Sequence, residues 1–482
     1  MDIKVYNTHI TLSPYYRTDD MNDNSLPIIE EMYTAIGAFD QQPFPCGYMI
    51  EQNVLYVPRG TPISKLEQLT GTKAIYINES DPSEEIFKEA EALFKPRNHL
   101  QEESIKFLTN SGNHQLALNL KTGQGKSFCV AAAITRLNKK AIIILPNNGL
   151  KYQWMKDTFI GMFTYQKSQL MDIAGSQVIR DFMEDNIEPR DIYFVTHATL
   201  RNYLNDNGGY ALGQFFKKLK VEVKVYDESH MEFANIINID HYTNTNRTWY
   251  LTATFDRSDK SESACFKRAF ANVEDYGGIE SHRLSVKHVL YHVVNINSRP
   301  TRKEMGKLMG FGGFTSIKYG RHAFFTDPKQ TCYRVIEMLC DKVKGIDGKT
   351  LIFTPLIESC NLVAEKLKKK FPEKRIAVYH SKADSDDRKH AFEKDIIVTT
   401  IKSCGTGKDI KDLRTVISAE PYASKNIAAQ AMGRLRNRPD KKDTLYFDIV
   451  DIGIPAENWW LRARMKVIST LAKEVIYLNM EE

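Results

Sequence analysis

Leu116–Ser127 reads L-A-L-N-L-K-T-G-Q-G-K-S, and a helical pattern follows over Lys126–Leu137. An apolar strand, a glycine-containing loop and a helix beginning at Lys-Ser form an arrangement that binds phosphates, because backbone N–H groups of the loop and the helix N-terminus face the anion. We expect Lys126 to reach the β- and γ-phosphates of ATP and Ser127 to hold Mg²⁺. The other loop residues assigned to the nucleotide are Thr122, Gly123 and Gly125.

A second candidate site, Asp227-Glu228-Ser229-His230, comes directly after the apolar run Val221–Tyr226. Carboxylates at the C-terminal end of a parallel strand point into the crevice where ligands bind. We expect Asp227 to hold Mg²⁺ through water and Glu228 to activate the water that attacks the γ-phosphate. Each pattern alone is common, and the phosphate loop has Leu120 where its usual first glycine would stand. The two sites together indicate a protein that hydrolyses ATP.

Short, unbroken apolar runs alternate with helical patterns such as Lys126–Leu137 and Asn361–Lys370. Unbroken runs are expected for strands covered by helices on both faces, and the alternation predicts parallel α/β sheets. The alternation occurs twice, which predicts an α/β chain of two tandem RecA-like parallel-sheet domains with a small N-terminal accessory domain. The expected strands are Ala141–Leu145, Ile192–Val195, Val221–Tyr226, Thr248–Thr252, Thr350–Thr354, Arg375–Tyr379 and Asp395–Thr400.

Three domains are expected along the chain. Residues 1–92 lack the strand–helix rhythm and form the accessory domain, for which DNA binding is one role to consider. Residues 93–283 hold both candidate sites and form the first RecA-like domain, and residues 284–482 form the second. Within the second, the stretch 299–321 is rich in glycine and basic residues, which predicts an insertion or a mobile hairpin.

Bulk composition narrows the functional classes. The chain of 482 residues is long enough for several domains, and its formal charge of +6 permits a nucleic acid as partner without demanding one. Seven scattered cysteines without a C-x-x-C pair argue against a disulfide framework or a structural zinc site. Neither a leader-like segment nor an apolar run of about 18 residues occurs, so we expect a cytoplasmic protein without a membrane partner.

Further short patterns flank the two sites. Those of the first half are P-R-N-H-L-Q with Arg97 and Gln101, Leu145-Pro146 with Gln153-Trp154, Thr196-His-Ala-Thr-Leu, and Leu251-Thr252-Ala-Thr254. Those of the second half are Leu351-Ile-Phe-Thr354, Tyr379-His-Ser, Thr399-Thr400 with Gly405–Ile410, and Gln430-Ala-Met-Gly-Arg434-Leu-Arg436. In this order the patterns resemble the motifs of superfamily 2 helicases of the DExH type, over about residues 95–470.

The resemblance implies a role for each matching residue. Adenine recognition falls to Arg97 and Gln101, and further nucleotide contacts to Gly407 and Asp409. The γ-phosphate is reached by Gln430, Arg434 and Arg436. Nucleic-acid contacts fall to Pro146, Thr196, Thr354 and Thr399, and the coupling of hydrolysis to domain movement to His230, Thr252 and Thr254.

The sixth motif departs from the family pattern. The usual form, Q-x-x-G-R-x-x-R, would place its second arginine at position 437, where Asn437 stands between Arg436 and Arg438. The G-R-x-R spacing is similar to that of viral origin-binding helicases, so we favour Arg436 as the second arginine finger. The alternative, Arg438, stays open.

Within the superfamily, the chain is most similar to phage and viral members. These are UvsW-type branch-migration helicases and herpesvirus-type origin-binding helicases, grouped with type III restriction motor subunits. The resemblance implies an ATP- and Mg²⁺-dependent DNA helicase or translocase that acts, as a monomeric motor, on single-stranded, forked or branched DNA. Its expected setting is replication or recombination in the cytoplasm of a phage-infected bacterium.

Basic and aromatic residues mark two further candidate contacts with nucleic acid. In the stretch 299–321, Arg302 and Lys303 are expected to contact phosphates, and Phe311 to stack on an unpaired base. The alternative for this stretch is a solvated surface loop. The helix around Trp459–Lys466 is also basic and aromatic, and for it we favour packing against the second domain.

Three other functions remain open. The motor motifs do not separate DNA from RNA, because the 2′-OH is read by local contacts, so an RNA helicase is the main alternative. A replication-origin recognition protein would use residues 1–92 to bind specific DNA. The motor subunit of a restriction complex would require a nuclease partner.

Overall fold

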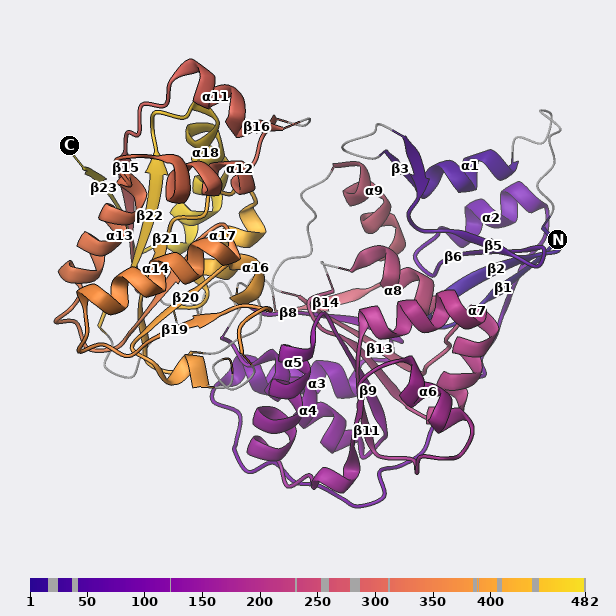
Figure 1. The fold of residues 1–482 in the computed structure, drawn as a ribbon. Coiled ribbons are helices and arrows are strands. Elements are labelled where there is room, and N and C mark those ends of the chain that lie inside the picture. Colours follow the sequence, from indigo (N-terminus) through magenta and orange to yellow (C-terminus); the bar gives the residue numbers. More distant parts are fainter. Residues whose placement is uncertain are drawn as a thin grey trace. The chain divides into compact units, whose positions relative to one another are not determined.

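A computed structural model of the chain describes residues 1–15, 25–36, 42–121, 123–229, 232–252, 260–277, 287–310, 313–384, 388, 390–404, 410–435 and 442–480. It divides into two compact units, Met1–Ser285 and Val286–Glu482 (Figure 1). Among the described residues, no helix combines the length and the apolar character needed to cross a membrane.

The first unit is built around a sheet of seven parallel strands in the order β10-β11-β9-β12-β13-β8-β14. Its central strands are unbroken apolar runs with both faces buried, as the sequence predicts for a helix-covered parallel sheet. The short outer strands β10 and β14 were not expected. The bounds are β8 Gln115–Asn119, β9 Ala141–Leu145, β10 Leu170–Ile173, β11 Ile192–Thr196, β12 Val223–Tyr226, β13 Arg247–Thr252 and β14 Glu274–Tyr276.

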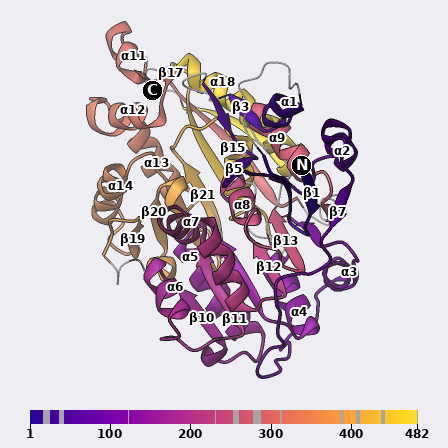
Figure 2. The ribbon, with the colours of Figure 1, turned by 90° about the vertical axis from the view of Figure 1, so that its right-hand side faces the viewer.

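Helices cover both faces of this sheet (Figures 1 and 2). One face packs on α3, α4 and α5, followed by the π-helical turn η1, in a core around Trp249 and Leu251. The other face packs on α6, α7, α8 and α9, around Tyr226 and Tyr250. The bounds are α3 His99–Asn110, α4 Lys126–Leu137, α5 Asn148–Gln153, η1 Trp154–Ile160, α6 Ser176–Met183, α7 His197–Leu219, α8 Phe233–Asp240 and α9 Lys260–Ala269.

The N-terminal residues form a second, smaller sheet in the order β5-β6-β2-β1-β7. Only the pairing of β1 with β7 is parallel; the others are antiparallel. Its buried residues belong to the same hydrophobic core as α7, α8 and α9, so this sheet is part of the first unit. The bounds are β1 Asp2–Val5, β2 His9–Ser13, α1 Ser25–Met32, β3 Thr34–Ile36, β4 Pro43–Pro45, β5 Met49–Glu51, β6 Val54–Pro58, α2 Ile63–Thr70 and β7 Ala74–Tyr76.

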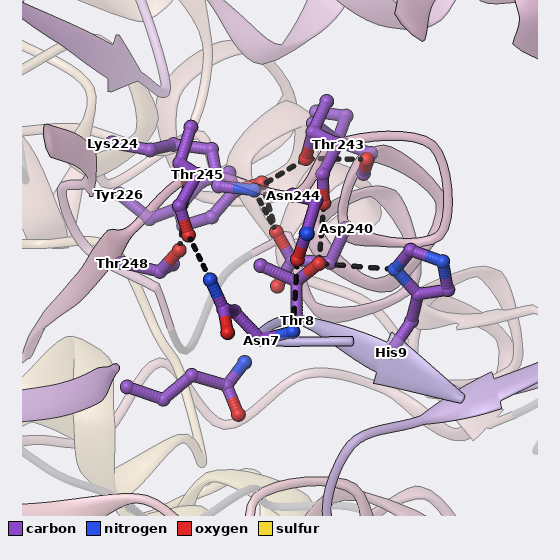
Figure 3. A network of polar contacts seen from close by, with 12 residues as sticks. Asn7, Thr8, His9, Lys224, Tyr226, Asp240, Thr243, Asn244, Thr245 and Thr248 are labelled. Carbon is purple, nitrogen blue, oxygen red and sulfur yellow. Dashed lines mark hydrogen bonds and ion pairs between the residues drawn. The ribbon is translucent and has the colours of Figure 1, made fainter. Parts of the chain in front are cut away.

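A buried polar cluster joins the two sheets of the first unit (Figure 3). Its centre is an ion pair between Lys224 on β12 and Asp240 at the end of α8, with 2.6 Å between Nζ and Oδ1. Tyr226 and Tyr250 each donate a hydroxyl hydrogen bond of 2.7 Å to the same carboxylate. Burial lowers the pKa of Lys224, and the charge of Asp240 acts against that shift. The Asp240 carboxylate therefore offsets part of the cost of burying the lysine side chain.

The turn between β1 and β2 contacts this cluster. The backbone N–H of Asn7 donates to Oδ1 of Asn244 at 2.8 Å, and the Thr8 hydroxyl donates to the carbonyl of Thr243. Thr243 in turn accepts a hydrogen bond from Lys224. The N-terminal sheet is thus tied to β12 by polar contacts as well as by the shared core.

The second unit repeats the parallel design, with strand order β19-β20-β18-β21-β22-β15-β23. Helices α13 and α14 cover one face, and α16, α17 and most of α18 cover the other. Two helix-covered parallel sheets confirm the predicted fold class. The bounds are β15 Val289–Ile296, α13 Thr331–Lys342, β18 Lys349–Phe353, α14 Ile357–Lys370, β19 Ile376–Tyr379, β20 Ile396–Thr399, α16 Ile401–Cys404, β21 Leu413–Ser418, α17 Lys425–Met432, β22 Thr444–Asp451, α18 Pro455–Leu471 and β23 Glu474–Asn479.

The basic stretch 299–321 folds into two short helices around a small hairpin. These are α11 (Arg302–Leu308), β16 (Met309–Gly310), β17 (Gly313–Phe314) and α12 (Ser316–Arg321). Phe314 packs edge-on against Trp460 of α18, with ring centroids 4.9 Å apart, and Tyr319 is fully buried. β16 and β17 pair antiparallel, and the Phe314 and Tyr319 rings pack into the unit, so neither ring is exposed for stacking on a base.

We predict that Lys224→Met lowers the free energy of unfolding of the first unit by about 3–5 kcal/mol, because it leaves the Asp240 carboxylate buried without its cation. Lys106→Met is the matched control. Nζ of Lys106 lies 2.7 Å from Oε1 of Glu103 on the exposed surface of α3, and its loss is expected to cost far less, because exposed ion pairs contribute little. Urea denaturation of the full chain measures both. Equal losses in the two variants would rule out a special contribution from the buried cluster.

Candidate functional site

Parallel strands bring the candidate residues of the first unit to one edge of its sheet. The phosphate loop follows β8, Pro146 follows β9, Thr196 ends β11, Asp227 follows β12 and Thr252 ends β13. Because these strands all run in one direction, their C-terminal ends meet at the same edge. The edge therefore collects residues that lie far apart in the sequence.

The phosphate loop depends on glycine at two positions. Gly123 and Gly125 have φ angles of 89° and 86°, a left-handed region that other residues seldom adopt. Gly125 caps the N-terminus of α4, which begins at Lys126. A Cβ added to Gly125 would lie 2.4 Å from Nε2 of Gln101. The left-handed backbone therefore favours glycine at position 125, and a side chain there would also have to displace the Gln101 amide.

Arg97 and Gln101 hold the loop from the side of α3. Nη2 of Arg97 donates to the carbonyl of Gly123 at 3.2 Å, and Nε2 of Gln101 donates to the carbonyl of Gln124 at 2.8 Å. The backbone N–H of Arg97 donates to Oε1 of Gln101 at 2.8 Å, which fixes the amide orientation. These contacts give the pair a role in setting the path of the loop; recognition of adenine by the same residues stays a prediction.

Lys126 and Ser127 open helix α4 at the end of the loop. Nζ of Lys126 donates to the carbonyl of Leu120 at 2.8 Å, so the lysine side chain contacts the start of its own loop. Its positive charge also lowers the pKa of Asp227, so the two side chains are close enough to interact. The structure thus brings together the lysine and the carboxylate that the sequence assigned to one site.

Asp227 is a buried carboxylate oriented by two donors. Oδ2 accepts a hydrogen bond of 2.8 Å from Nε1 of Trp154, and Oδ1 accepts one of 3.0 Å from the backbone N–H of Glu228. Burial, and then the neighbouring charge of Glu228, raise the pKa of Asp227 to about 6, while Trp154 and Lys126 act in the opposite direction. A cation next to Asp227 would favour its charged form.

Glu228 lies in the left-handed region with φ of 50°, an uncommon conformation for a residue with a side chain. The next residue fixes this turn, because the backbone N–H of Ser229 donates to the carbonyl of Leu251 on β13 at 3.0 Å. Backbone strain of this kind is often found at functional sites. Here it places two adjacent carboxylates, Asp227 and Glu228, at the C-terminal end of β12.

The threonines predicted to contact nucleic acid have buried side chains. Thr196 accepts a hydrogen bond of 3.2 Å from the backbone N–H of Thr199 and so caps α7. In the second unit, the Thr354 hydroxyl contacts Leu356 and Cys360, and the Thr399 hydroxyl donates to the carbonyl of Tyr379. Neither Thr354 nor Thr399 has exposed surface, which does not support a direct phosphate contact from either hydroxyl. Pro146 is half-buried.

Other predicted residues lie on the second unit or outside the described part of the chain. Gln430 lies within α17 and is half-buried, and Arg434 follows the end of that helix with its side chain buried. Arg302 and Lys303 are exposed at the start of α11. Thr252 is fully buried at the end of β13. The predicted residues outside the described ranges are Thr122, His230, Thr254, Phe311, Gly407, Asp409 and Arg436.

The sequence did not reveal the contact between Trp154 and Asp227. Gln153-Trp154 belongs to the same sequence pattern as Leu145-Pro146, and nothing in the spacing of residues 154 and 227 predicts a hydrogen bond. The contact depends on the fold, in which the strand that leads into this segment, β9, is the neighbour of β12 in the sheet.

The donor set fits a magnesium nucleotide. The loop offers a glycine cradle that a Cβ would fill, a helix N-terminus and the Lys126 ammonium group for phosphates. Ser127 offers a hydroxyl and Asp227 a carboxylate, the hard oxygen ligands that Mg²⁺ prefers.

We predict that Gly125→Ala abolishes nucleotide binding, because the new Cβ would collide with Gln101 and the left-handed backbone would be strained. Binding of a fluorescent ATP analogue measures the effect. Gly112→Ala is the control, since a Cβ there meets nothing within 4 Å. Normal nucleotide affinity in Gly125→Ala would show that the nucleotide does not use this loop.

Comparison with known proteins gives two family models in the expected order. Residues 83–257 match the res subunit of type III restriction enzymes, and residues 334–437 match the helicase conserved C-terminal domain. Transcript termination protein A18 of Yaba monkey tumor virus is 21% identical over 339 residues, which cover 66% of this chain and 64% of that protein. The chain thus spans less than two thirds of the length of this relative.

Solved structures share the fold at low sequence identity. Dbp5 of S. cerevisiae, bound to RNA and ADP BeF3, is 15% identical with a TM-score of 0.56, over 80% of this chain and 90% of that one. A fragment of an HsdR subunit of a type I restriction enzyme from Vibrio vulnificus YJ016 is 17% identical with a TM-score of 0.52, over 86% and 73%. With two helix-covered parallel sheets and both family models in order, the chain belongs to the superfamily 2 helicases.

Proposed function

We propose that this chain is an ATP-dependent DNA helicase or translocase that unwinds or remodels forked and branched DNA in phage replication or recombination. The observation that carries the proposal is the meeting of the Gly125 loop, Lys126 and the Asp227–Glu228 pair at one sheet edge. The match of residues 83–257 to a restriction-enzyme subunit favours DNA.

RNA is the second candidate substrate. The fold is similar to that of Dbp5, whose structure was solved with RNA bound, although 15% identity carries no argument beyond the fold. A helicase that acts on RNA would use the same nucleotide site. The experiment that tests the proposal therefore compares both nucleic acids.

In the proposed mechanism, the first unit binds and positions ATP. Lys126 and the N-terminal amides of α4 hold the β- and γ-phosphates, while Ser127 and Asp227 hold Mg²⁺. Mg²⁺, when bound, supplies charge that polarises the phosphoryl oxygens. Glu228 orients the attacking water and accepts its proton. Trp154 and the Glu228 backbone keep the Asp227 carboxylate in one orientation.

The second unit supplies positive charge in this proposal. Arg434 and Arg436 stabilise the charge that develops on the γ-phosphate, a contribution worth about 10³–10⁵ in rate where an arginine finger is used. Hydrolysis then depends on both units, so turnover can be coupled to movement along a strand. Arg436 belongs to the undescribed stretch that begins after Leu435.

Nucleic-acid binding is proposed for two exposed basic surfaces of the second unit. Arg302 and Lys303 are exposed at the start of α11. On α18, Trp460 packs inward as expected, but Trp459 is 69% exposed. Arg462 and Lys466 follow on the same exposed helix face. Both helices follow the C-terminal ends of parallel strands, β15 and β22.

The first experiment is Mg²⁺-dependent ATP turnover by the purified chain, alone and with single-stranded DNA, forked DNA, duplex DNA or RNA. We expect strong stimulation by single-stranded and forked DNA and little by RNA. Glu228→Gln serves as the negative control. It should bind ATP but not hydrolyse it, because the amide cannot accept the proton of the attacking water. Near-normal turnover in that variant would remove Glu228 from its role, and stimulation by RNA alone would make RNA the substrate.

A charge-reversed pair tests the basic surface. Arg302→Glu combined with Lys303→Glu should weaken DNA binding and lower the slope of log affinity against log salt by about 2, one unit for each lost phosphate contact. Lys369→Glu is the control, because Lys369 is exposed on α14 and already paired with Glu365 at 2.8 Å. If the double variant and the control bind DNA equally well over a salt series, α11 does not contact phosphates.

A further inference from the structure

The segment after β9 connects two predicted functions. It begins at Pro146, assigned to nucleic acid, continues through α5 and reaches Trp154, the first residue of η1. The Trp154 side chain is 3% exposed, and its Nε1–H donates to Oδ2 of Asp227 at 2.8 Å. One short segment therefore runs from a candidate nucleic-acid contact to the carboxylate of the phosphate site.

The hydrogen bond restricts how Asp227 can turn. An indole N–H is a donor only, so Trp154 can hold the carboxylate without competing for its protons. Oδ1 is held at the same time by the backbone N–H of Glu228, at 3.0 Å. With one donor on each oxygen, the plane of the carboxylate is fixed, and each oxygen keeps a lone pair for a cation or its bound water.

The segment itself is well braced. The Asn147 side chain accepts a hydrogen bond of 3.0 Å from the backbone N–H of Leu150 and so caps α5. Lys151 is buried and forms an ion pair with Asp172 on β10. The helix then changes to the wider π form at Trp154, a rare geometry often found at functional sites. The start of α5 and the indole are thus joined by one continuous helical segment, α5 followed directly by η1.

We infer that Trp154 is a positioning residue whose indole N–H orients Asp227 and links the start of α5 to the phosphate site. The inference rests on the proposed function. It implies that nucleic acid bound beside Pro146 and a magnesium nucleotide bound beside Asp227 change each other's affinity by the same factor, because such coupling is reciprocal. Trp154 acts through Asp227 and does not touch the nucleotide.

Trp154→Phe and Trp249→Phe form a matched pair of variants. Both replace a buried indole by a smaller ring in the core of the same unit. Trp154 loses its hydrogen bond to Asp227, whereas Nε1 of Trp249 has no hydrogen-bond partner among the described residues. A difference between the variants therefore reports the hydrogen bond and not the loss of volume.

The first readout needs no nucleotide. In the ¹⁵N-labelled full chain, the indole N–H signal that disappears in Trp154→Phe is assigned to Trp154. We expect Asp227→Asn to shift this signal and to leave the Trp249 signal in place. Adding ADP with Mg²⁺ to the wild-type protein should shift the Trp154 signal as well. A Trp154 signal that responds to neither change would overturn the inference.

The second readout is binding of a fluorescent ADP at varied Mg²⁺ concentration, with and without single-stranded DNA. Loss of the partner that orients a metal ligand typically costs about 10–100-fold in metal affinity, so Trp154→Phe should need that much more Mg²⁺. Its ADP affinity without Mg²⁺ should be unchanged, and the effect of DNA on ADP affinity should fall toward none. Trp249→Phe should match the wild type in each respect.

The outcomes separate this inference from the proposed function. Equal losses in both variants would mean that Trp154 only fills space, which overturns the inference and leaves the proposed function intact. If the wild-type chain binds no magnesium nucleotide at all, the proposed function fails and the inference fails with it. Normal Mg²⁺ dependence and normal coupling to DNA in Trp154→Phe would overturn the inference alone.

Discussion

Each large sheet of this protein has a single strand direction, and the candidate site depends on that constraint. Parallel strands expose their C-terminal ends at one edge, so the loops that follow β8, β9, β11 and β12 emerge side by side. Neighbouring strands lie about 4.7–4.9 Å apart. Since only β13 separates β8 from β12, Lys126 and Asp227 come within electrostatic reach of each other. The chemistry of the site follows from strand order before any side-chain detail is added.

The interior strands and the helix that begins at the phosphate loop could be predicted from the sequence. Unbroken apolar runs such as Ala141–Leu145 became buried strands, and helix α4 has the bounds that its pattern indicates. The outer strands could not be predicted in the same way. β14, for example, reads Glu-Asp-Tyr and is partly exposed, so it lacks the apolar run by which buried strands are recognised.

For the candidate site, the residue types could be predicted from the sequence, but the hydrogen-bond partners of those residues could not. The glycines, Lys126 and the Asp227–Glu228 pair carry their chemistry in the local sequence, and the structure brings them to one edge. The contacts of Arg97 and Gln101 with loop carbonyls, and of Trp154 with Asp227, depend on how distant segments pack. Thr354 and Thr399 show the same limit. A motif gives the identity of a residue, but the burial of its side chain depends on its place in the folded sheet.

The shared core beneath the N-terminal sheet has a consequence for how such a chain can evolve. Ile3, Leu12 and Leu55 belong to the same apolar cluster as the helices α7, α8 and α9, and the turn at Asn7 contacts the polar cluster around Lys224. A gene fusion that exchanged the first 92 residues for another module would expose the buried apolar residues of α7, α8 and α9 to water. Replacement of the N-terminal segment would therefore require matching changes in α7, α8 and α9, whose buried residues share its core.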